Sequence, residues 1–181
     1  MKTFEIIPVP PRNAVDVFKL LPEGTLCEVI NNAIYMSPSP TASHQRMLKW
    51  IFKQLDSFVE LNKSGEVFFS ALDVFLDDEN IFQPDLIFIS SKNTGELDPD
   101  GGFHGVPDLI VEVLSTFNKE HDLVKKKLVY EKCGVKEYWV IDPEKGEAMG
   151  FELKGRFFHE FPKAKGKMKS LLLKKTFSLR F

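Results

Sequence analysis

The chain has 181 residues, of which 43% are hydrophobic and 28% are charged, and its formal net charge is −2. This length suits one domain, residues 1–181, with a substantial core, and the composition excludes a largely disordered protein. The apolar runs are too short to span a membrane, and the first residues lack a signal peptide's hydrophobic region. Because Cys27 and Cys133 stand far apart, we expect a cytoplasmic protein with reduced thiols.

The N-terminal third predicts an extended arm, a short helix, a hairpin and a long helix. Three prolines favour an extended arm over residues 1–11, and Asn13 can cap the helix that follows. The Asn31-Asn32 pair tolerates positive φ and predicts a hairpin turn. Apolar residues then repeat every three or four positions, which indicates a helix packed on a sheet. The expected elements are a helix over 14–21, strands over 26–30 and 33–36, and a helix over 43–62.

The rest of the chain predicts a mixed sheet. A second hairpin turns at residues 77–80, and a loop rich in glycine and acidic residues is expected to be the most mobile part. A strand, a helix and a strand then form a compact βαβ unit, which requires parallel strands. The fold class is therefore α/β (α+β), with a central mixed β-sheet flanked by helices. The expected elements are strands over 66–76 and 81–90, the loop over 91–105, a strand over 108–115, a helix beginning near Thr116 or Asn118 and ending at Cys133, a strand over 137–141, and antiparallel strands over 148–161 and 170–181.

Two carboxylates stand where buried strands should avoid them. Asp85 directly precedes the apolar run 86–89, and Glu112 lies inside the apolar run 109–114. An ionised carboxylate in a core costs several kcal/mol unless a cation or hydrogen-bond donors compensate it. The sequence therefore predicts that Asp85 and Glu112 converge on a shared cation.

A polar line on the following helix points to the same site. Asp122, Lys126 and Tyr130 lie four residues apart, so they share one helix face, while the apolar residues Leu123, Val124 and Leu128 occupy a partly different face. This line can face the C-terminal end of the strand that carries Glu112, where ligands of α/β sheets gather. We therefore expect Lys126 close to the two carboxylates.

The expected chemistry is phosphodiester hydrolysis. Ligation by oxygen alone favours Mg²⁺ or Mn²⁺ over zinc. Such a metal, with Asp85 and Glu112 as ligands, can polarise a phosphoryl oxygen and lower the pKa of a bound water. A lysine beside the metal can orient that water or stabilise developing negative charge.

Four phrases of the chain resemble the Uma-two family of endonucleases, within the PD-(D/E)XK restriction-endonuclease-like superfamily. They are CEVINNAIYMSPSPTASHQ, QPDLIFIS, VPDLIVEVLS and HDLVKKKLVYEKCGVKEYWVIDP, and the resemblance runs from about residue 18 to 143. It implies a restriction-endonuclease-like fold and a Mg²⁺-dependent DNA nuclease. By the matching motifs it implies roles for five residues: metal ligands Asp85 and Glu112, the catalytic lysine Lys126, an additional acidic residue Glu28, and the site-flanking residue His44. Asp122 and Tyr130, which share the helix face of Lys126, are supporting candidates from their spacing alone.

One position departs from the superfamily's pattern. The usual E-x-K motif would place a lysine at position 114, where this chain has Leu114. Lys126 must then supply the ammonium group from the helix. If it does not reach the carboxylates, a non-catalytic DNA-binding or assembly module that retains the nuclease fold becomes the alternative. A metal-dependent hydrolase of small phosphoesters is a further alternative, since an acidic chain suits a small substrate.

The charge is unevenly distributed along the chain. Residues 151–181 hold nine Lys or Arg against two Glu, a local net charge of +7 (9 − 2). This basic segment can contact nucleic-acid phosphates, or it can be a solvated face that balances acidic loops elsewhere. Its Phe-rich strands are also candidates for pairing two copies into a homodimer.

Overall fold

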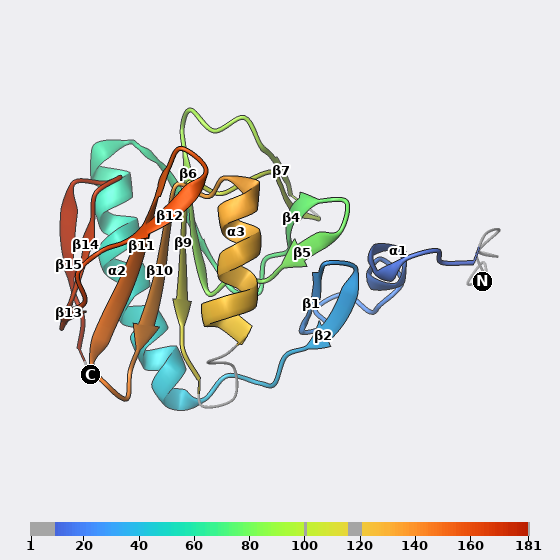
Figure 1. The fold of residues 1–181 in the computed structure, drawn as a ribbon, viewed down its shortest axis with the longest axis horizontal. Coiled ribbons are helices and arrows are strands. Elements are labelled where there is room, and N and C mark those ends of the chain that lie inside the picture. Colours follow the sequence, from blue (N-terminus) through green and yellow to red (C-terminus); the bar gives the residue numbers. More distant parts are fainter. Residues whose placement is uncertain (1–9, 100, 116–120, 181) are drawn as a thin grey trace.

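A computed structural model describes residues 10–99, 101–115 and 121–180, with the backbone alone for residues 121–123 (Figure 1). Most of the predicted N-terminal arm lies outside the described residues. The elements in chain order are α1 (Ala14–Phe18), β1 (Cys27–Ile30), β2 (Ala33–Met36), α2 (Ala42–Asn62), β3 (Gly65–Phe69), β4 (Val74–Asp77), β5 (Asn80–Phe82), β6 (Leu86–Ser90), β7 (Glu96–Asp98), β8 (Gly102–His104), β9 (Leu109–Val113), the π-helix η1 (His121–Lys126), α3 (Lys127–Cys133), β10 (Glu137–Asp142), β11 (Glu147–Lys154), β12 (Phe157–Glu160), β13 (Ala164–Lys165), β14 (Lys167–Ser170) and β15 (Lys175–Ser178).

The strands form two larger sheets and one hairpin. The central sheet has the order β12-β11-β10-β9-β6-β3, with β13 also paired to β11, and the side sheet has the order β2-β1-β5-β4-β8-β7. β14 and β15 pair with each other alone. β9 and β10 are parallel, whereas β6 and β9 are antiparallel. The predicted mixed sheet and its βαβ unit are therefore confirmed.

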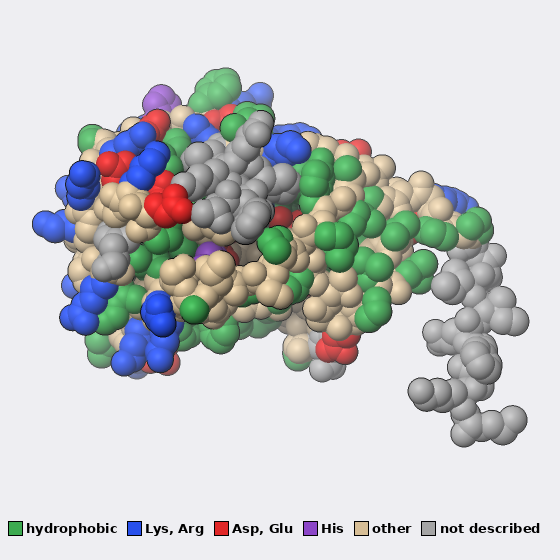
Figure 2. All heavy atoms as spheres, turned by 90° about the horizontal axis from the view of Figure 1, so that it is seen from below, with side chains coloured by type: hydrophobic (Ala, Val, Ile, Leu, Met, Phe, Trp, Pro, Cys, Tyr) green, Lys and Arg blue, Asp and Glu red, His purple; other side chains and the backbone are tan. Residues whose placement is uncertain are grey.

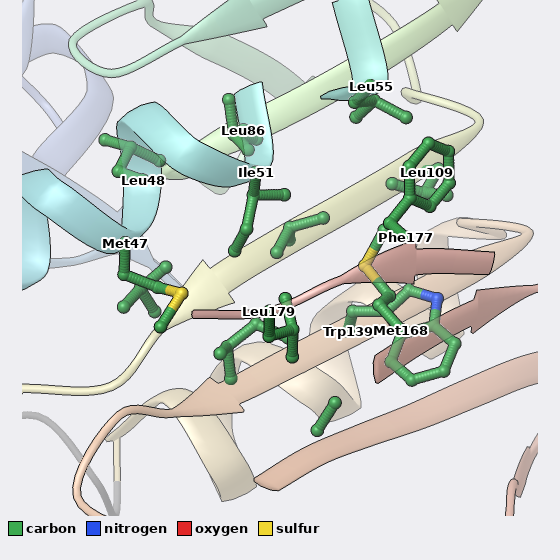
Figure 3. Packing of buried hydrophobic residues seen from close by; sticks show 14 of the residues in the cluster. Met47, Leu48, Ile51, Leu55, Leu86, Leu109, Trp139, Met168, Phe177 and Leu179 are labelled. Atoms are coloured by element: carbon green, nitrogen blue, oxygen red, sulfur yellow. The ribbon is translucent and has the colours of Figure 1, made fainter. Parts of the chain in front are cut away.

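The central sheet is covered on both faces. α2 and the β14–β15 hairpin pack on one face, where the labelled residues of Figure 3 form a continuous apolar cluster. α3 and the side sheet cover the other face with a second cluster that includes Ile110, Leu114, Val129 and Tyr130. Because successive strand residues point to opposite faces, Val111 and Val113 of β9 face α2, while Glu112 points with Ile110 toward α3.

The N-terminal elements follow the predictions closely. Asn13 caps α1 by accepting a hydrogen bond from the Asp16 backbone N–H (2.8 Å), although α1 ends three residues earlier than expected. The β1–β2 turn holds Asn31 and Asn32 at φ 48° and 59°, the left-handed values that a two-residue hairpin turn needs. α2 begins one residue earlier than predicted and ends at Asn62, as expected.

The predicted second hairpin is wrong in its extent. The segments 66–76 and 81–90 are not two continuous strands, because each divides between the two sheets: β3 pairs with β6 in the central sheet, and β4 pairs with β5 in the side sheet. Pro84 lies at the break on the second segment, and a proline cannot donate a ladder hydrogen bond. The interruption therefore leaves Asp85 at the junction of the sheets.

The segment 91–105 is more ordered than predicted. It contains β7 and β8, which pair antiparallel, and β8 also pairs parallel with β4. Phe103 of β8 is buried in the second apolar cluster, so this segment forms the edge of the side sheet rather than a mobile loop. The predicted C-terminal strands are present as β11 to β15. None of the helices within the described ranges is both long and apolar enough to cross a membrane.

Candidate active site

One pocket gathers residues from several elements between residues 26 and 126. It has a volume of about 130 Å³ and lies where β1, the first turn of α2, the β5–β6 junction, β9 and the π-helix η1 meet. Five of the seven residues predicted from the sequence line this pocket, which we call the carboxylate pocket: Glu28, His44, Asp85, Glu112 and Lys126. Glu28 and Lys126 lie 98 positions apart along the chain, so they share one site only through the tertiary fold.

Lys126 lies between two buried carboxylates. Its Nζ atom is 2.9 Å from Oε1 of Glu28 and 3.0 Å from Oε1 of Glu112, and the lysine side chain is only 7% exposed. Burial of an ion is tolerable when an opposite charge compensates it. The three groups together, when ionised, leave one negative charge in excess, which favours a further cation in the pocket.

Tyr130 supports Glu112 from behind the pocket. Its hydroxyl donates a hydrogen bond to Oε1 of Glu112 (2.9 Å), the same oxygen that Lys126 contacts, and the tyrosine side chain is fully buried. Burial, together with the negative charges of Glu112 and Glu28, raises the pKa of Tyr130 well above its ordinary value. The phenol therefore keeps its proton and acts as a permanent donor that orients the carboxylate.

Asp85 is held by one backbone donor and one ring. Its Oδ2 accepts a hydrogen bond from the Val113 backbone N–H (2.7 Å) and lies 2.9 Å from Nε2 of His44. His44 is itself placed by the start of α2, where Thr41 caps the helix and accepts from the His44 backbone N–H (3.3 Å). These contacts fix the orientation of Asp85 through one of its two oxygens, so that Oδ1 makes no hydrogen bond to the described residues.

Glu28 is held in place by Gln83, a residue that the sequence analysis did not identify as part of the site. The Gln83 backbone N–H donates to Oε1 of Glu28 (3.0 Å), and the Gln83 side chain bonds the Thr25 carbonyl (3.1 Å) and Asp73 (2.8 Å). Burial raises the pKa of Asp73, although the hydrogen bond from Gln83 opposes this effect. Gln83 therefore connects Glu28 of β1 to the β5–β6 junction. In the sequence, its position directly before Pro84-Asp85 is the feature that could have identified it as a residue of the site.

The polar side chains Lys126 and Tyr130 face inward, whereas the apolar side chains Val124 and Leu128 face solvent. Lys126 and Tyr130 are 5% and 0% exposed, whereas Val124 and Leu128 are 52% and 59% exposed. The described part of the polar line therefore faces Glu112, as predicted, and these apolar residues lie on a different face that the structure leaves in solvent. The side chain of Asp122 lies outside the described residues, as does the expected cap at Thr116 or Asn118.

Leu114 stands where an E-x-K motif would have its lysine, and the structure shows why an apolar residue fits there. Its side chain is 4% exposed and belongs to the apolar cluster under α3, so position 114 contributes to the core. The ammonium group instead comes from Lys126, 3.0 Å from Glu112. Lys126 thus reaches Glu112, as the sequence required, whereas the side chain of Asp85 contacts His44 and the Val113 N–H.

The donors of the pocket fit a hard divalent cation. Asp85 and Glu112 both supply carboxylate oxygens to the same cavity, and Mg²⁺ is commonly bound through one or two carboxylates, with waters and substrate phosphate oxygens completing its shell. Among the described residues, no group of three or more His, Cys, Asp or Glu side chains forms a complete metal cage. The pair is therefore suited to a cation shared with substrate rather than to a closed structural site.

Cysteine chemistry does not compete for this role. Cys27 and Cys133 are both free thiols, as predicted. Burial, reinforced by the Asp77 carboxylate, raises the pKa of Cys133 to about 11, and burial also raises the pKa of Cys27. Because the thiolate is the nucleophilic form, neither thiol is activated for attack.

Comparisons with known proteins point in the same direction as the pocket. A family model described as "Uma2: Putative restriction endonuclease" matches residues 15–177. Among solved structures, the chain is similar to a putative nuclease belonging to DUF820 from Anabaena variabilis ATCC 29413, with a TM-score of 0.69 and 19% sequence identity. That match covers 83% of this chain and 84% of the other. No curated protein matches the chain.

Proposed function

Because this chain belongs to the Uma2 family of putative restriction endonucleases, we propose that it is a Mg²⁺-dependent endonuclease that hydrolyses phosphodiester bonds in DNA. The observation that carries the proposal is the carboxylate pocket itself, in which Asp85, Glu112 and Lys126 line one cavity. The family match supports a hydrolase of nucleic acid. The metal, the role of the lysine and the choice of DNA are our inference from the side chains of the pocket.

Asp85 and Glu112 would hold the cation. When bound, Mg²⁺ polarises a phosphoryl oxygen and lowers the pKa of a coordinated water. His44 and the Val113 N–H keep Asp85 in one orientation, and Tyr130 does the same for Glu112. Because these groups are already oriented before the reaction, no free energy is lost in reorganising them as the transition state forms.

Lys126 supplies the positive charge that the phosphoryl group needs. Its ammonium is already held near the pocket by Glu28 (2.9 Å), so it can donate to the attacking water or to a non-bridging oxygen as negative charge develops. Glu28 is then a positioning residue for the lysine, and Gln83 holds Glu28 in turn. This assignment gives each buried polar group of the pocket a part in one reaction.

The test is cleavage of plasmid DNA with added Mg²⁺ or Mn²⁺ by the wild type, Asp85→Asn and Lys126→Met. We expect each substitution to slow cleavage by about a hundredfold or more, the scale of a lost positioned acid–base or electrostatic group. Lys132→Ala is the matched control, because Lys132 is an exposed lysine of the same helix that does not line the pocket. Circular dichroism and thermal unfolding report whether each variant folds.

Metal binding provides a second readout of the same proposal. Calorimetric titration with Mn²⁺ should show binding to the wild type that Glu112→Gln loses, since the amide is nearly isosteric but uncharged. Cleavage that persists in both Asp85→Asn and Lys126→Met would contradict the proposal. Duplex binding without any cleavage by the wild type would support the non-catalytic module instead, and turnover confined to small phosphoesters would support the third alternative.

A further inference from the structure

A second hollow opens on α2 next to the carboxylate pocket. It has a volume of about 380 Å³, and its α2 residues recur every three or four positions on one helix face. The first of them, Ser43, directly precedes His44 of the carboxylate pocket. We call this hollow the arginine groove; it is lined by Ser43, Arg46, Met47, Trp50, Pro143 and Arg180.

The groove is positively charged. Arg46 and Arg180 are the charged residues that line it, both are exposed, and neither forms an ion pair with a carboxylate of the described residues. Figure 2 shows Lys and Arg side chains gathered at the left of the view, the side on which Figure 1 shows the C-terminal strands. An arginine pair without a carboxylate partner is suited to a ligand that brings its own negative charge, and arginine matches phosphate bidentately.

Arg180 is held in place before any ligand arrives. Its guanidinium lies 3.9 Å from the centroid of the Trp50 ring, a stacking distance. The Trp50 Nε1 donates to the Ser178 carbonyl (2.9 Å), and Gln54 bonds the same carbonyl (2.7 Å) as well as the Ser178 N–H (3.1 Å). A side chain ordered in advance loses less conformational entropy on binding.

We propose that the arginine groove binds the phosphodiester backbone of a nucleic acid whose scissile phosphate occupies the carboxylate pocket; this inference rests on the proposed function. Trp50 is six residues beyond His44, about 9 Å along the helix axis. One strand of duplex DNA carries a phosphate about every 3.4 Å along the duplex axis. The groove therefore contacts a phosphate about two or three nucleotides from the cleavage point, so a polymeric substrate uses it and a small phosphoester does not.

The test is the salt dependence of binding to a fluorescein-labelled DNA duplex of mixed sequence, measured by fluorescence anisotropy in EDTA. We compare the wild type with Arg46→Ala/Arg180→Ala, and with Lys92→Ala/Lys132→Ala, which removes two exposed cations outside both hollows. We expect the arginine variant to bind about tenfold or more weakly and its slope of log K against log salt to fall by about two. The lysine control should leave the slope of the wild type unchanged.

Two further measurements separate a lost contact from a damaged fold or a failed reaction. Arg46→Lys/Arg180→Lys keeps both charges and should retain most of the salt slope, even though Arg180 stacks on Trp50 in the wild type. Hydrolysis of bis(p-nitrophenyl) phosphate with Mn²⁺ should proceed at the wild-type rate in the double alanine variant, because this substrate does not reach the groove.

The outcomes distinguish the two proposals. An unchanged salt slope in Arg46→Ala/Arg180→Ala, or a wild type that does not bind duplex, would overturn the groove inference while plasmid cleavage tests the function separately. A wild type that binds duplex through the groove but hydrolyses neither substrate would overturn the proposed function and support the groove as a phosphate-binding surface.

Discussion

Lys126 carries the positive charge nearest to two buried carboxylates, and the stability of the pocket depends on it. Its ammonium lies about equally far from Glu28 and Glu112, at 2.9 and 3.0 Å. Removing one partner of a buried ion pair costs more than the pair contributes, because the remaining charge is left uncompensated. Glu112 keeps a second donor in Tyr130, whereas Glu28 keeps the Gln83 backbone N–H. The lysine is therefore expected to be structural as well as catalytic.

We predict that Lys126→Met lowers the free energy of unfolding by about 3 kcal/mol, because two carboxylates lose their shared cation. Adding Glu28→Gln to this variant should restore about 1 kcal/mol, since one uncompensated charge is removed. Urea unfolding of the wild type, both single variants and the double variant gives the coupling energy. Strictly additive losses would show that the ammonium does not compensate Glu28.

At the scale of elements, Asp108 joins three neighbouring strands of the central sheet. It precedes β9 and accepts hydrogen bonds from the Ser90 backbone N–H at the end of β6 and from Asn93 (both 2.8 Å). It also pairs with Lys136, directly before β10. Although burial acts to raise the pKa of Asp108, the hydrogen bonds from Asn93, Lys136 and Ser90 outweigh it and lower this pKa below its ordinary value.

The sign of the pH dependence follows from this lowered pKa. Because Asp108 binds a proton less readily in the folded state, its stabilising contribution is complete above the unfolded pKa of about 4 and is lost as the pH falls through the folded pKa. We predict that Asp108→Asn destabilises the protein by about 1–3 kcal/mol at neutral pH and loses less stability than the wild type on acidification. Urea unfolding at a series of pH values checks both parts. An identical acid dependence in the variant would contradict the assignment.

At the scale of the whole molecule, the C-terminal hairpin belongs to the main core. Met168 of β14, Phe177 of β15 and Leu179 are buried in the cluster between α2 and the central sheet (Figure 3). Phe177 packs edge-on against Phe58 of α2, with ring centroids 5.9 Å apart. This phenylalanine was one of the candidates for pairing two copies, and its burial makes it unavailable for that purpose.

Phe177→Ala should therefore destabilise the entire fold rather than loosen one hairpin. We expect a loss of about 3–5 kcal/mol in the free energy of unfolding, as for other large aromatic residues truncated in a core. Thr176→Ala is the matched control, because Thr176 is the exposed neighbour on the same strand. A calorimetric scan should show one transition moved to lower temperature, and a separate early transition would mean that the hairpin unfolds on its own.

Local patterns determined much of the fold from the sequence alone. The Asn31-Asn32 turn, the apolar repeat of α2 and the continuous apolar run of β9 each depend on neighbouring residues, so these elements lie close to their predicted places. The carboxylates Asp85 and Glu112 were also visible as charges in apolar segments. Their cost of burial predicted compensating groups nearby: Lys126 contacts Glu112, and His44 and the Val113 N–H contact Asp85. A cation shared by both carboxylates stays a prediction.

Only the tertiary structure decided how these pieces meet. The division of the segments 66–76 and 81–90 between two sheets depends on strand pairings that no local pattern encodes. The inward turn of Lys126, with Val124 and Leu128 left in solvent, follows from Glu112 on a strand fourteen residues earlier. The arginine groove joins α2 to a strand end more than a hundred residues later. The spacing of apolar residues and the local composition depend on residues that are close in the chain. A functional site depends on side chains that are distant in the chain and that the fold brings together.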